Sequence, residues 1–210
     1  MHILVTGGAG FIGSHVAEAL LARGDRVTVI DNLDPYYDPA QKQANLDLLM
    51  KKKGFTFLNV DITDFDAVDK VFSGRQFDAI IHLAAKVGVR SSLEDPLGYY
   101  ETNVKGTLIL LETARKHGIG RFIFASSSSV YGNSKKVPFS EKEAPLIPIS
   151  PYAATKLAGE QLCHTYHHLY GLKVSCLRFF TVYGPRGRPD MAVFKFTKHI
   201  SEGKPIPVYA

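Results

Sequence analysis

Tyr152 and Lys156 are the two residues whose types and spacing most directly suggest catalysis. On a helix that begins near Pro151, residues four positions apart lie on the same face, so the phenol and the ammonium group would be neighbours. A free phenol has a pKa of ~10, and a nearby positive charge lowers that pKa by favouring the phenolate. Tyr152 could therefore exchange protons near neutral pH while Lys156 supplies the charge.

Four consecutive serines, Ser126–Ser129, follow an apolar segment with the composition of a buried strand. Hydroxyl groups at the carboxyl end of a parallel strand line the ligand crevice of an open α/β sheet. For at least two of the four, a polar loop is the simpler interpretation. The run predicts hydroxyls at the ligand edge of the sheet.

The segment Gly7-Gly8-Ala9-Gly10-Phe11-Ile12-Gly13 follows the first apolar run directly and opens the first helical pattern. Gly7 would permit a tight turn, Gly10 a close approach of the backbone to a pyrophosphate, and Gly13 close packing of helix on strand. The amino end of that helix, at Phe11 and Ile12, would face the phosphate charge. A plain strand-to-helix turn is the alternative.

Asp31 favours the dinucleotide over that alternative. It ends the second apolar run and follows the glycines at close to the ~20 residues expected of the acid that binds the adenosine ribose. A carboxylate there accepts hydrogen bonds from ribose hydroxyls and repels a 2′-phosphate, so NAD is favoured over NADP. Asp61 and Ile62, after the third run, are suitably placed for the adenine.

Short apolar runs alternate with helical patterns, which is typical of βαβ units around a parallel sheet. The predicted fold class is α/β, a doubly wound parallel (Rossmann) sheet. The expected strands are Ile3–Thr6, Arg26–Ile30, Thr56–Val60, Ala79–His82, Arg121–Ala125 and Lys173–Arg178. The expected helices are Phe11–Arg23, Ala44–Lys53, Phe65–Phe72, Pro96–His117, Pro151–Tyr170 and Asp190–Glu202.

A Pro/Gly-rich stretch, residues 183–189, follows the sixth predicted strand and divides the chain. We expect residues 1–180 to form an NAD-binding domain. Residues 181–210 would begin a smaller, C-terminal substrate lobe that is incomplete, with a further strand at Pro207–Ala210.

The composition excludes several classes. With 45% hydrophobic and 21% charged residues, the chain is neither disordered nor fibrous. Its net charge of +5 and the placement of its aromatic residues do not favour nucleic-acid binding. The two cysteines predict neither a disulfide framework nor a zinc ribbon, and His164 with His168 lacks a third metal ligand, so no metal site is expected. The absence of a leader or an apolar span predicts a cytoplasmic protein that does not associate with membranes.

Several features spread along the chain have the types and order found in one enzyme family: Gly7–Gly13, Asp31, His82–Ala85, Asn103, Ser127, and Tyr152 with Lys156. Together they resemble the extended short-chain dehydrogenase/reductase family, and specifically its nucleotide-sugar epimerases. Three further segments are similar to the UDP-glucuronate 4-epimerases within that family: Asp31–Asp38, Val87–Arg90 and Arg178–Ala192.

The resemblance implies a reaction and a set of roles. NAD-dependent 4-epimerisation of a UDP-sugar, with UDP-glucuronate the leading substrate, would pass through a transient 4-keto sugar. Tyr152 would act as the base, Lys156 would lower its pKa, and Ser127 would align the 4-oxygen. The implied cofactor-binding residues are Gly7, Gly10, Phe11, Ile12, Gly13, Asp31, Asn32, Asp61, Ile62, Leu83, Ala84, Ala85, Asn103, Tyr152 and Lys156. The implied substrate-binding residues are Arg90, Ser127, Ser128, Ser129, Tyr152, Thr181 and Arg188.

The residues near Ser127 disfavour one related activity and leave others open. Related 4,6-dehydratases carry an Asp-Glu pair where this chain has Ser128 and Ser129, and hydroxyls cannot do that acid and base work. Those hydroxyls, with Thr181 and either Arg186 or Arg188, could instead bind a C6 carboxylate. A UDP-glucose or UDP-N-acetylhexosamine 4-epimerase, and a non-catalytic NAD-binding module, remain alternatives.

Two further expectations come from the resemblance alone. Proteins of this kind are substantially longer, so much of the lobe that grips the nucleotide would be missing from this chain. They usually form homodimers through two long helices, which here would be Pro96–His117 and Pro151–Tyr170.

Overall fold

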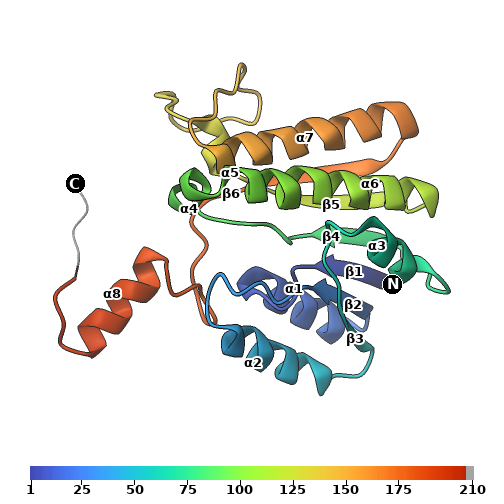
Figure 1. Cartoon of the computed structure of the whole chain (residues 1–210), viewed down its shortest axis with the longest axis horizontal. Helices are drawn as coiled ribbons and strands as arrows, with labels where there is room; N and C mark the ends of the chain where they lie inside the picture. The colour runs from blue at the N-terminus through green and yellow to red at the C-terminus, as the bar shows by residue number, and fades with distance from the viewer. Residues whose placement is uncertain (207–210) are drawn as a thin grey trace.

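Six parallel strands form one sheet in the order β3-β2-β1-β4-β5-β6, as shown by a computed structural model that describes residues 1–206 (Figure 1). This order is the doubly wound arrangement, in which the winding direction reverses between β1 and β4. The predicted fold class is confirmed. The strands are β1 His2–Thr6, β2 Arg26–Asp31, β3 Phe55–Asn59, β4 Ala79–His82, β5 Arg121–Ser127 and β6 Lys173–Phe179.

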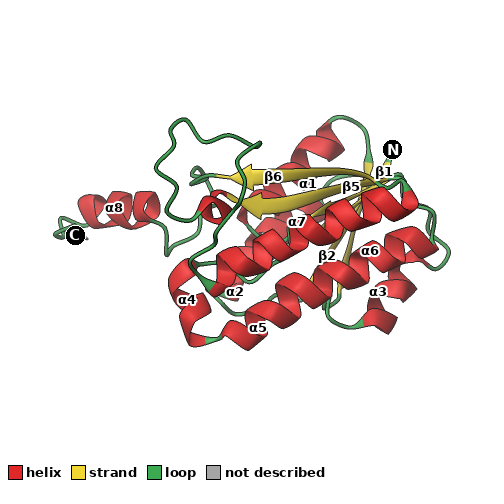
Figure 2. Ribbon diagram, turned by 90° about the horizontal axis from the view of Figure 1, so that it is seen from above, coloured by secondary structure: helices red, strands yellow, loops and turns green. Residues whose placement is uncertain are grey.

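Helices cover both faces of the sheet, and α8 stands apart from it (Figure 2). Helices α1 and α2 pack on one face, whereas α3, the α5–α6 rod and α7 pack on the other. Their bounds are α1 Phe11–Ala22, α2 Pro39–Met50, α3 Phe65–Phe72, α4 Val89–Glu94, α5 Pro96–Tyr100, α6 Gly106–Lys116, α7 Pro151–Tyr170 and α8 Ala192–Ser201. A π-helical turn, η1 (Glu101–Lys105), joins α5 to α6, and a 3-10 turn, η2 (Ser128–Tyr131), follows β5.

Each face of the sheet has its own apolar layer. One joins Leu4, Ile80 and Phe122 of the strands to α3, α6 and α7, and the other joins Val5, Val27 and the remaining strand face to α1 and α2. Strands buried on both faces explain why the apolar runs are continuous rather than alternating. The two layers hold the carboxyl ends of the strands in one row, where the candidate site lies.

The second helix begins earlier than predicted. The sequence pattern indicated Ala44–Lys53, but α2 spans Pro39–Met50 because Asp38 caps it by accepting a hydrogen bond from the Ala40 N–H at 2.9 Å. Pro39 is in the first turn of the helix. Proline has no backbone N–H, but this costs the helix nothing there, because N–H groups of the first turn have no partner within the helix. The earlier start brings Lys42 into the helix.

The end of the described chain leaves the sheet after β6. Helix α8 has no buried residue, consistent with its position away from the sheet in Figure 1. The strand predicted at Pro207–Ala210 lies outside the described residues. Within residues 1–206, no helix combines the length and the apolar character that crossing a bilayer requires.

Candidate active site

The turn between β1 and α1 can be built only from glycine at its key positions. Gly7 has a φ of +70°, and a Cβ there would lie 2.6 Å from the backbone nitrogen of Ala84. A Cβ on Gly13 would lie 2.2 Å from the carbonyl oxygen of Gly7. Gly10 is less constrained, since a Cβ there would make a tight contact of 3.3 Å with the Gly7 oxygen and an ordinary one of 3.8 Å with the Tyr37 hydroxyl.

The amino end of α1 can receive an anion. Gly10 is the N-cap residue and no side chain caps the helix, so the first turn, at Phe11 and Ile12, offers its backbone N–H groups. The first turn carries no acidic residue that would repel a phosphate. Gly10, Phe11, Ile12 and Gly13 are therefore brought together as a cradle for a pyrophosphate.

Asp31 lies beside this turn with both carboxylate oxygens partly satisfied. It is 6% exposed; Oδ2 accepts from the Ala9 N–H at 3.2 Å and Oδ1 from the Leu33 N–H at 2.9 Å. Each oxygen keeps a further lone pair. Lys42 Nζ lies 3.5 Å from Oδ1. The carboxylate is fixed in position and able to accept from a ribose diol.

Asn32 and Asp61 meet at the ends of β2 and β3. The Asn32 Nδ2 group donates to Asp61 Oδ2 at 2.9 Å, and the Asp61 Oδ1 atom accepts from the backbone and hydroxyl of Thr63. Burial would raise the pKa of Asp61, but these hydrogen bonds outweigh it and lower the pKa. Ile62 is buried against Gly106, so the pair lies at the edge of an apolar surface suited to a flat base.

Lys156 is buried, 4% exposed, on the inner face of α7. Its Nζ atom donates to the carbonyl oxygen of Ala125 on β5 at 2.8 Å and lies 6.0 Å from the centroid of the Tyr152 ring. Burial lowers the pKa of Lys156 to about 8. The ammonium is thus held at the catalytic edge and titrates close to the physiological range.

Tyr152 lies one turn before Lys156, with its ring perpendicular to that of Tyr99 at a centroid distance of 6.2 Å. Burial raises the pKa of Tyr152, while a hydrogen bond with Ser127 and the charge of Arg188 act in the opposite direction. The structure therefore brings Tyr152, Ser127 and Lys156 together as predicted. The pKa of the phenol is nevertheless above its ordinary value, and Lys156 is not among the groups that shift it, so this structure does not show the lowering by Lys156 that the sequence led us to expect.

The four serines divide by position. Ser126 and Ser127 are the last residues of β5 and are buried, whereas Ser128 and Ser129 begin η2 and are half-buried. Ser126 points away from the site, since its hydroxyl donates to Glu160 at 2.5 Å and Glu160 pairs with Arg178 at 2.8 Å. Ser127 faces Tyr152, and its Oγ atom also accepts from the Ser129 N–H at 3.1 Å.

Asn103 lies in the π-helical turn η1, 2% exposed. Its Oδ1 atom accepts from the Lys86 N–H at 2.8 Å, and its Nδ2 group donates to the Lys86 carbonyl at 3.0 Å and to Thr155 Oγ1 at 3.1 Å. Asn103 thereby joins the segment after β4 to the helix that carries Lys156. Its side chain is committed to the protein, which makes it a support for the site.

Residues Leu83–Ala85 continue β4 past the glycine turn. Thr6 Oγ1 accepts from the Leu83 and Ala84 N–H groups at 3.2 and 3.1 Å and pairs with His82 Nδ1 at 2.7 Å. Burial, followed by the charge of Lys156, lowers the pKa of His82 to about 3. A neutral His82 therefore braces the strand ends between β1 and β4.

The two candidate arginines have different surroundings. Arg186 turns toward α1, where its Nη2 atom lies 2.7 Å from Glu18 and 2.8 Å from His15. Arg188 turns toward the site: it pairs with Asp190 through two contacts, 2.5 and 3.0 Å, and lies over the Tyr36 ring at 5.4 Å. Of the two, only Arg188 acts on Tyr152 electrostatically.

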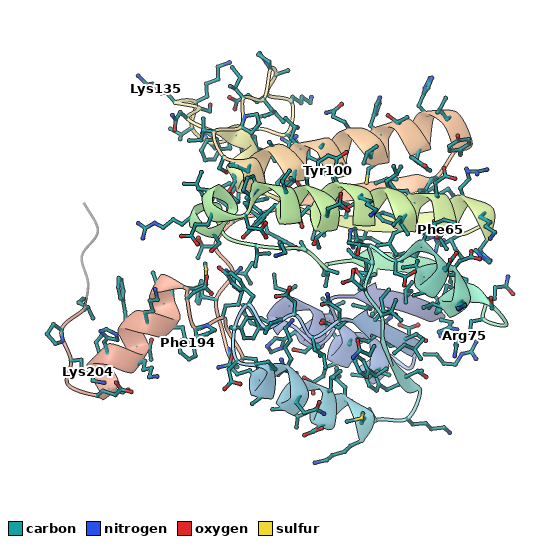
Figure 3. The ribbon with its side chains drawn as sticks, in the orientation of Figure 1. Phe65, Arg75, Tyr100, Lys135, Phe194 and Lys204 are labelled. Carbon is teal, nitrogen blue, oxygen red and sulfur yellow. The ribbon has the colours of Figure 1, made fainter. Side chains whose placement is uncertain are left out.

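The remaining predicted substrate residues are dispersed. Arg90 is exposed on α4, and Thr181 follows β6. Thr181 and Arg188 line a pocket of ≈ 420 Å³ between the β6–α8 connection and α8, and Phe194 reaches into the same space from α8 (Figure 3). Tyr152, Ser127 and Lys156 do not line this pocket. It adjoins the catalytic edge through Arg188.

Sequence reasoning missed Lys42, Tyr37, Tyr99 and Asp190 as neighbours of the site. A signal for Lys42 existed, since Lys42, Asn45, Leu46 and Leu49 have the spacing of one helical face and all four are buried. The predicted start of that helix at Ala44 left Lys42 outside the pattern. Within residues 1–206, no three His, Cys, Asp or Glu side chains are close enough to share a metal ion.

The fold and this edge define a dinucleotide-binding protein of the doubly wound class that also carries a tyrosine–lysine pair. The chain belongs to the NAD dependent epimerase/dehydratase family, whose model matches residues 3–210.

Individual proteins and solved structures of this kind are similar to the chain. The chain is 49% identical over 208 residues to a UDP-glucuronate 4-epimerase of Thermodesulfobacterium geofontis, covering 99% of this chain and 64% of that protein. It is similar to the crystal structure of UDP-glucuronic acid 4-epimerase from Bacillus cereus in complex with UDP-glucuronic acid and NAD, with 42% identity, a TM-score of 0.92, and coverage of 100% and 66%.

A UDP-glucose 4-epimerase of Thermus thermophilus, in complex with NAD, is also similar, with 40% identity, a TM-score of 0.89, and coverage of 100% of this chain and 66% of that one. The chain thus spans about two thirds, or somewhat less, of the length of these relatives. The similarity of the fold does not by itself separate one sugar from another.

Proposed function

We propose that the protein catalyses NAD-dependent 4-epimerisation of a nucleotide sugar, interconverting UDP-glucuronate and UDP-galacturonate. One observation carries the proposal: Tyr152, Ser127 and the buried Lys156 meet at the end of β5, on the same edge as a glycine turn that fits a dinucleotide. The named relatives support the choice of sugar.

The cofactor would be held along the ends of β1 to β4. Gly7, Gly10, Phe11, Ile12 and Gly13 would hold the pyrophosphate, Asp31 and Asn32 the adenosine ribose, and Asp61 and Ile62 the adenine, with Leu83–Ala85 beneath the nicotinamide half. When bound, the nicotinamide supplies the reversible oxidation and reduction at C4 of the sugar.

Tyr152 is the residue placed to move the proton of the sugar 4-hydroxyl. Its phenolate would accept that proton when C4 is oxidised, and the resulting phenol would return it to the 4-oxygen when C4 is reduced, so Tyr152 ends as a phenolate again. Ser127, which faces Tyr152, would donate to the same oxygen and align it.

Lys156 supports the phenolate by its charge and would hold the nicotinamide ribose by its ammonium protons. Its hydrogen bond to the Ala125 carbonyl at 2.8 Å fixes the ammonium at the end of β5. Because burial lowers its pKa to about 8, the charge is present at neutral pH and is lost in mild alkali.

The C6 carboxylate of the sugar would meet Arg188, with Ser128, Ser129, Thr181 and Arg90 as further donors. Arg188 lies near Tyr152, and Asp190 holds its Nε and Nη2 atoms, so the remaining guanidinium protons would donate to the sugar carboxylate. A neutral C6 hydroxymethyl group would gain little from that charge, which favours UDP-glucuronate over UDP-glucose.

The domain organisation and the assembly are part of the proposal. Residues 1–180 would bind the dinucleotide, residues 181–210 would begin the sugar-binding lobe, and two copies would associate through the α5–α6 rod and α7. Those helices pack side by side and expose Leu97, Tyr100, Leu108, Leu169 and Tyr170. Cys163 and Cys176 are free thiols, which suits a reducing compartment, the cytoplasm.

Incubation with NAD⁺ and either UDP-glucuronate or UDP-glucose, followed by anomeric-proton NMR, tests the function. Conversion of UDP-glucuronate alone is the expected result. Conversion of UDP-glucose alone would assign the alternative epimerase. No conversion of either, with NAD⁺ bound, would support a binding module, and the same assay on a C-terminally extended chain would show whether turnover needs the remaining lobe.

A further inference from the structure

Lys42 is a buried lysine whose ammonium group lacks a close partner. The residue is 7% exposed, and the nearest carboxylate oxygen, Asp31 Oδ1, is 3.5 Å from Nζ. That separation exceeds the ~2.7–3.2 Å of a normal N–H···O hydrogen bond. Nζ also lies 5.5 Å from the centroid of the Tyr37 ring. An ammonium group with three donors is costly to bury unless something accepts from it.

The position of Lys42 is set by its own helix rather than by chance. On the same face of α2, one turn later, Asn45 Nδ2 donates to the carbonyl oxygen of Ala9 in the glycine turn at 2.9 Å. Ala9 in turn donates its N–H to Asp31. Helix α2 is therefore fixed to the dinucleotide cradle, and Lys42 is held at the side of Asp31.

We propose that Lys42 binds the adenosine ribose of the dinucleotide together with Asp31, and that it moderates the rejection of a 2′-phosphate. A ribose hydroxyl that lies beside both groups can donate to Asp31 and accept from Lys42 at the same time, which would give the ammonium group the acceptor that it lacks. This inference rests on the proposed function only in requiring that the protein binds a nicotinamide dinucleotide. It does not depend on which sugar is bound or on the reaction that is catalysed.

The charge balance gives the second half of the proposal. Asp31 alone would repel a 2′-phosphate, but Lys42 beside it cancels that charge and supplies a donor to phosphate oxygens. The pair would bind NAD⁺ through the diol and would reject NADP⁺ less strongly than a lone carboxylate. Removal of Lys42 should therefore weaken the binding of both nucleotides, and that of NADP⁺ more.

Titration calorimetry of NAD⁺ and NADP⁺ with the whole chain tests this without any assay of turnover. We expect Lys42→Met to weaken NAD⁺ by about tenfold, the loss of one charge-assisted hydrogen bond. We expect it to weaken NADP⁺ by about a hundredfold, since repulsion by Asp31 is added. The matched control is Lys51→Met, which removes the same charge from the exposed end of the same helix and should change both affinities by less than about twofold.

A double variant guards against a folding defect, because Lys42→Met leaves the buried Asp31 charge without its cation. Asp31→Asn with Lys42→Met removes both charges, and we expect NADP⁺ to regain affinity relative to NAD⁺ in that variant. Wild-type affinity for NAD⁺ in Lys42→Met would overturn the inference. So would equal losses for the two nucleotides, or a preference in the double variant identical to that of Lys42→Met. A chain that binds NAD⁺ as expected but converts no sugar would instead contradict the proposed function.

Discussion

Asn103 Nδ2 donates to Thr155 Oγ1 across 3.1 Å, from the π-helical turn to the residue that precedes Lys156 on α7. Asn103 is the buried residue of this turn, and π turns in otherwise α-helical segments are frequent at functional sites. The same amide holds the backbone of Lys86. The position of the catalytic helix therefore depends on a residue far from it in sequence.

Replacement of Asn103 by alanine should lower turnover by about tenfold or more and the free energy of unfolding by ~1–3 kcal/mol, because the partly buried Lys86 N–H loses its acceptor. Steady-state kinetics and urea unfolding would measure the two effects. Asn133→Ala, at an exposed position, is the control. A variant with full activity would show that Asn103 does not position α7.

Tyr152→Phe should abolish turnover and leave NAD⁺ bound, because it removes the proton-transferring hydroxyl and keeps the ring that packs against Tyr99. The product assay by NMR, together with NAD⁺ calorimetry, separates the two properties. Tyr170→Phe, an exposed tyrosine on the same helix, should retain both. Turnover by Tyr152→Phe would contradict the assignment of Tyr152 as the residue that transfers the proton.

The titration of Lys156 should appear in the pH dependence of turnover. Its pKa of about 8 predicts that kcat falls as the pH rises through that value, because the charge beside Tyr152 is lost. Lys156→Met should show a low rate without this decline. The folded-state pKa is depressed, so the unfolded chain binds more protons above pH 8, and wild-type stability should rise from about pH 8 toward 10. If kcat of Lys156→Met still declined with pH, the decline would have to come from the titration of another group.

His82 should make the fold sensitive to acid. Burial lowers its pKa to about 3, so below pH ~6.5 the unfolded chain binds a proton that the folded chain does not. Its contribution to stability should then fall by ~1.4 kcal/mol per pH unit as the pH drops from 6.5 toward 3. Urea unfolding of wild type and His82→Gln at pH 6.5, 5.5 and 4.5 would measure it. Equal slopes in both proteins would contradict the prediction.

Gly7→Ala should be more damaging than Gly24→Ala, although both glycines have positive φ values, +70° and +92°. A Cβ on Gly24 meets nothing within 4 Å, so that variant loses only ~1 kcal/mol from backbone strain. A Cβ on Gly7 would collide with Ala84, which adds steric strain and moves the phosphate cradle. Thermal unfolding and NAD⁺ calorimetry would report the difference, and equal losses would refute it.

Local patterns in the sequence predicted most of the sheet and the core of the site. Apolar runs bounded by turn residues identified all six strands within a few residues, and the bounds of α3 and α7 were predicted correctly. Part of the site could be predicted, because the strand order places the carboxyl ends of β1, β2 and β5 at one edge of the sheet. Tyr152 and Lys156 share a face of α7 because of their spacing, and they lie near Ser127 because α7 packs on β5.

What the sequence did not reveal depends on contacts between distant segments. The inward lysine of α2 was missed because the helix was expected to start later, and α4 was missed because it has only 6 residues. Arg186 and Arg188 have the same side chain and neighbouring positions, yet one pairs with Glu18 and the other with Asp190. Only the path of the backbone after β6 decides which of them faces Tyr152.

That path has an energetic consequence. Arg186 pairs with Glu18, and the Pro185 carbonyl oxygen lies 2.9 Å from His15 Nε2, so two adjacent residues attach the connection after β6 to α1. The conformational entropy of residues 184–190 is lost when the chain folds, so it is not lost again when a ligand binds. The connection is in this sense preorganised for binding. Because α1 also forms the phosphate cradle, the cradle and the connection that carries Arg188 are joined through α1. Any coupling of ligand affinity between these two places must be equal in both directions.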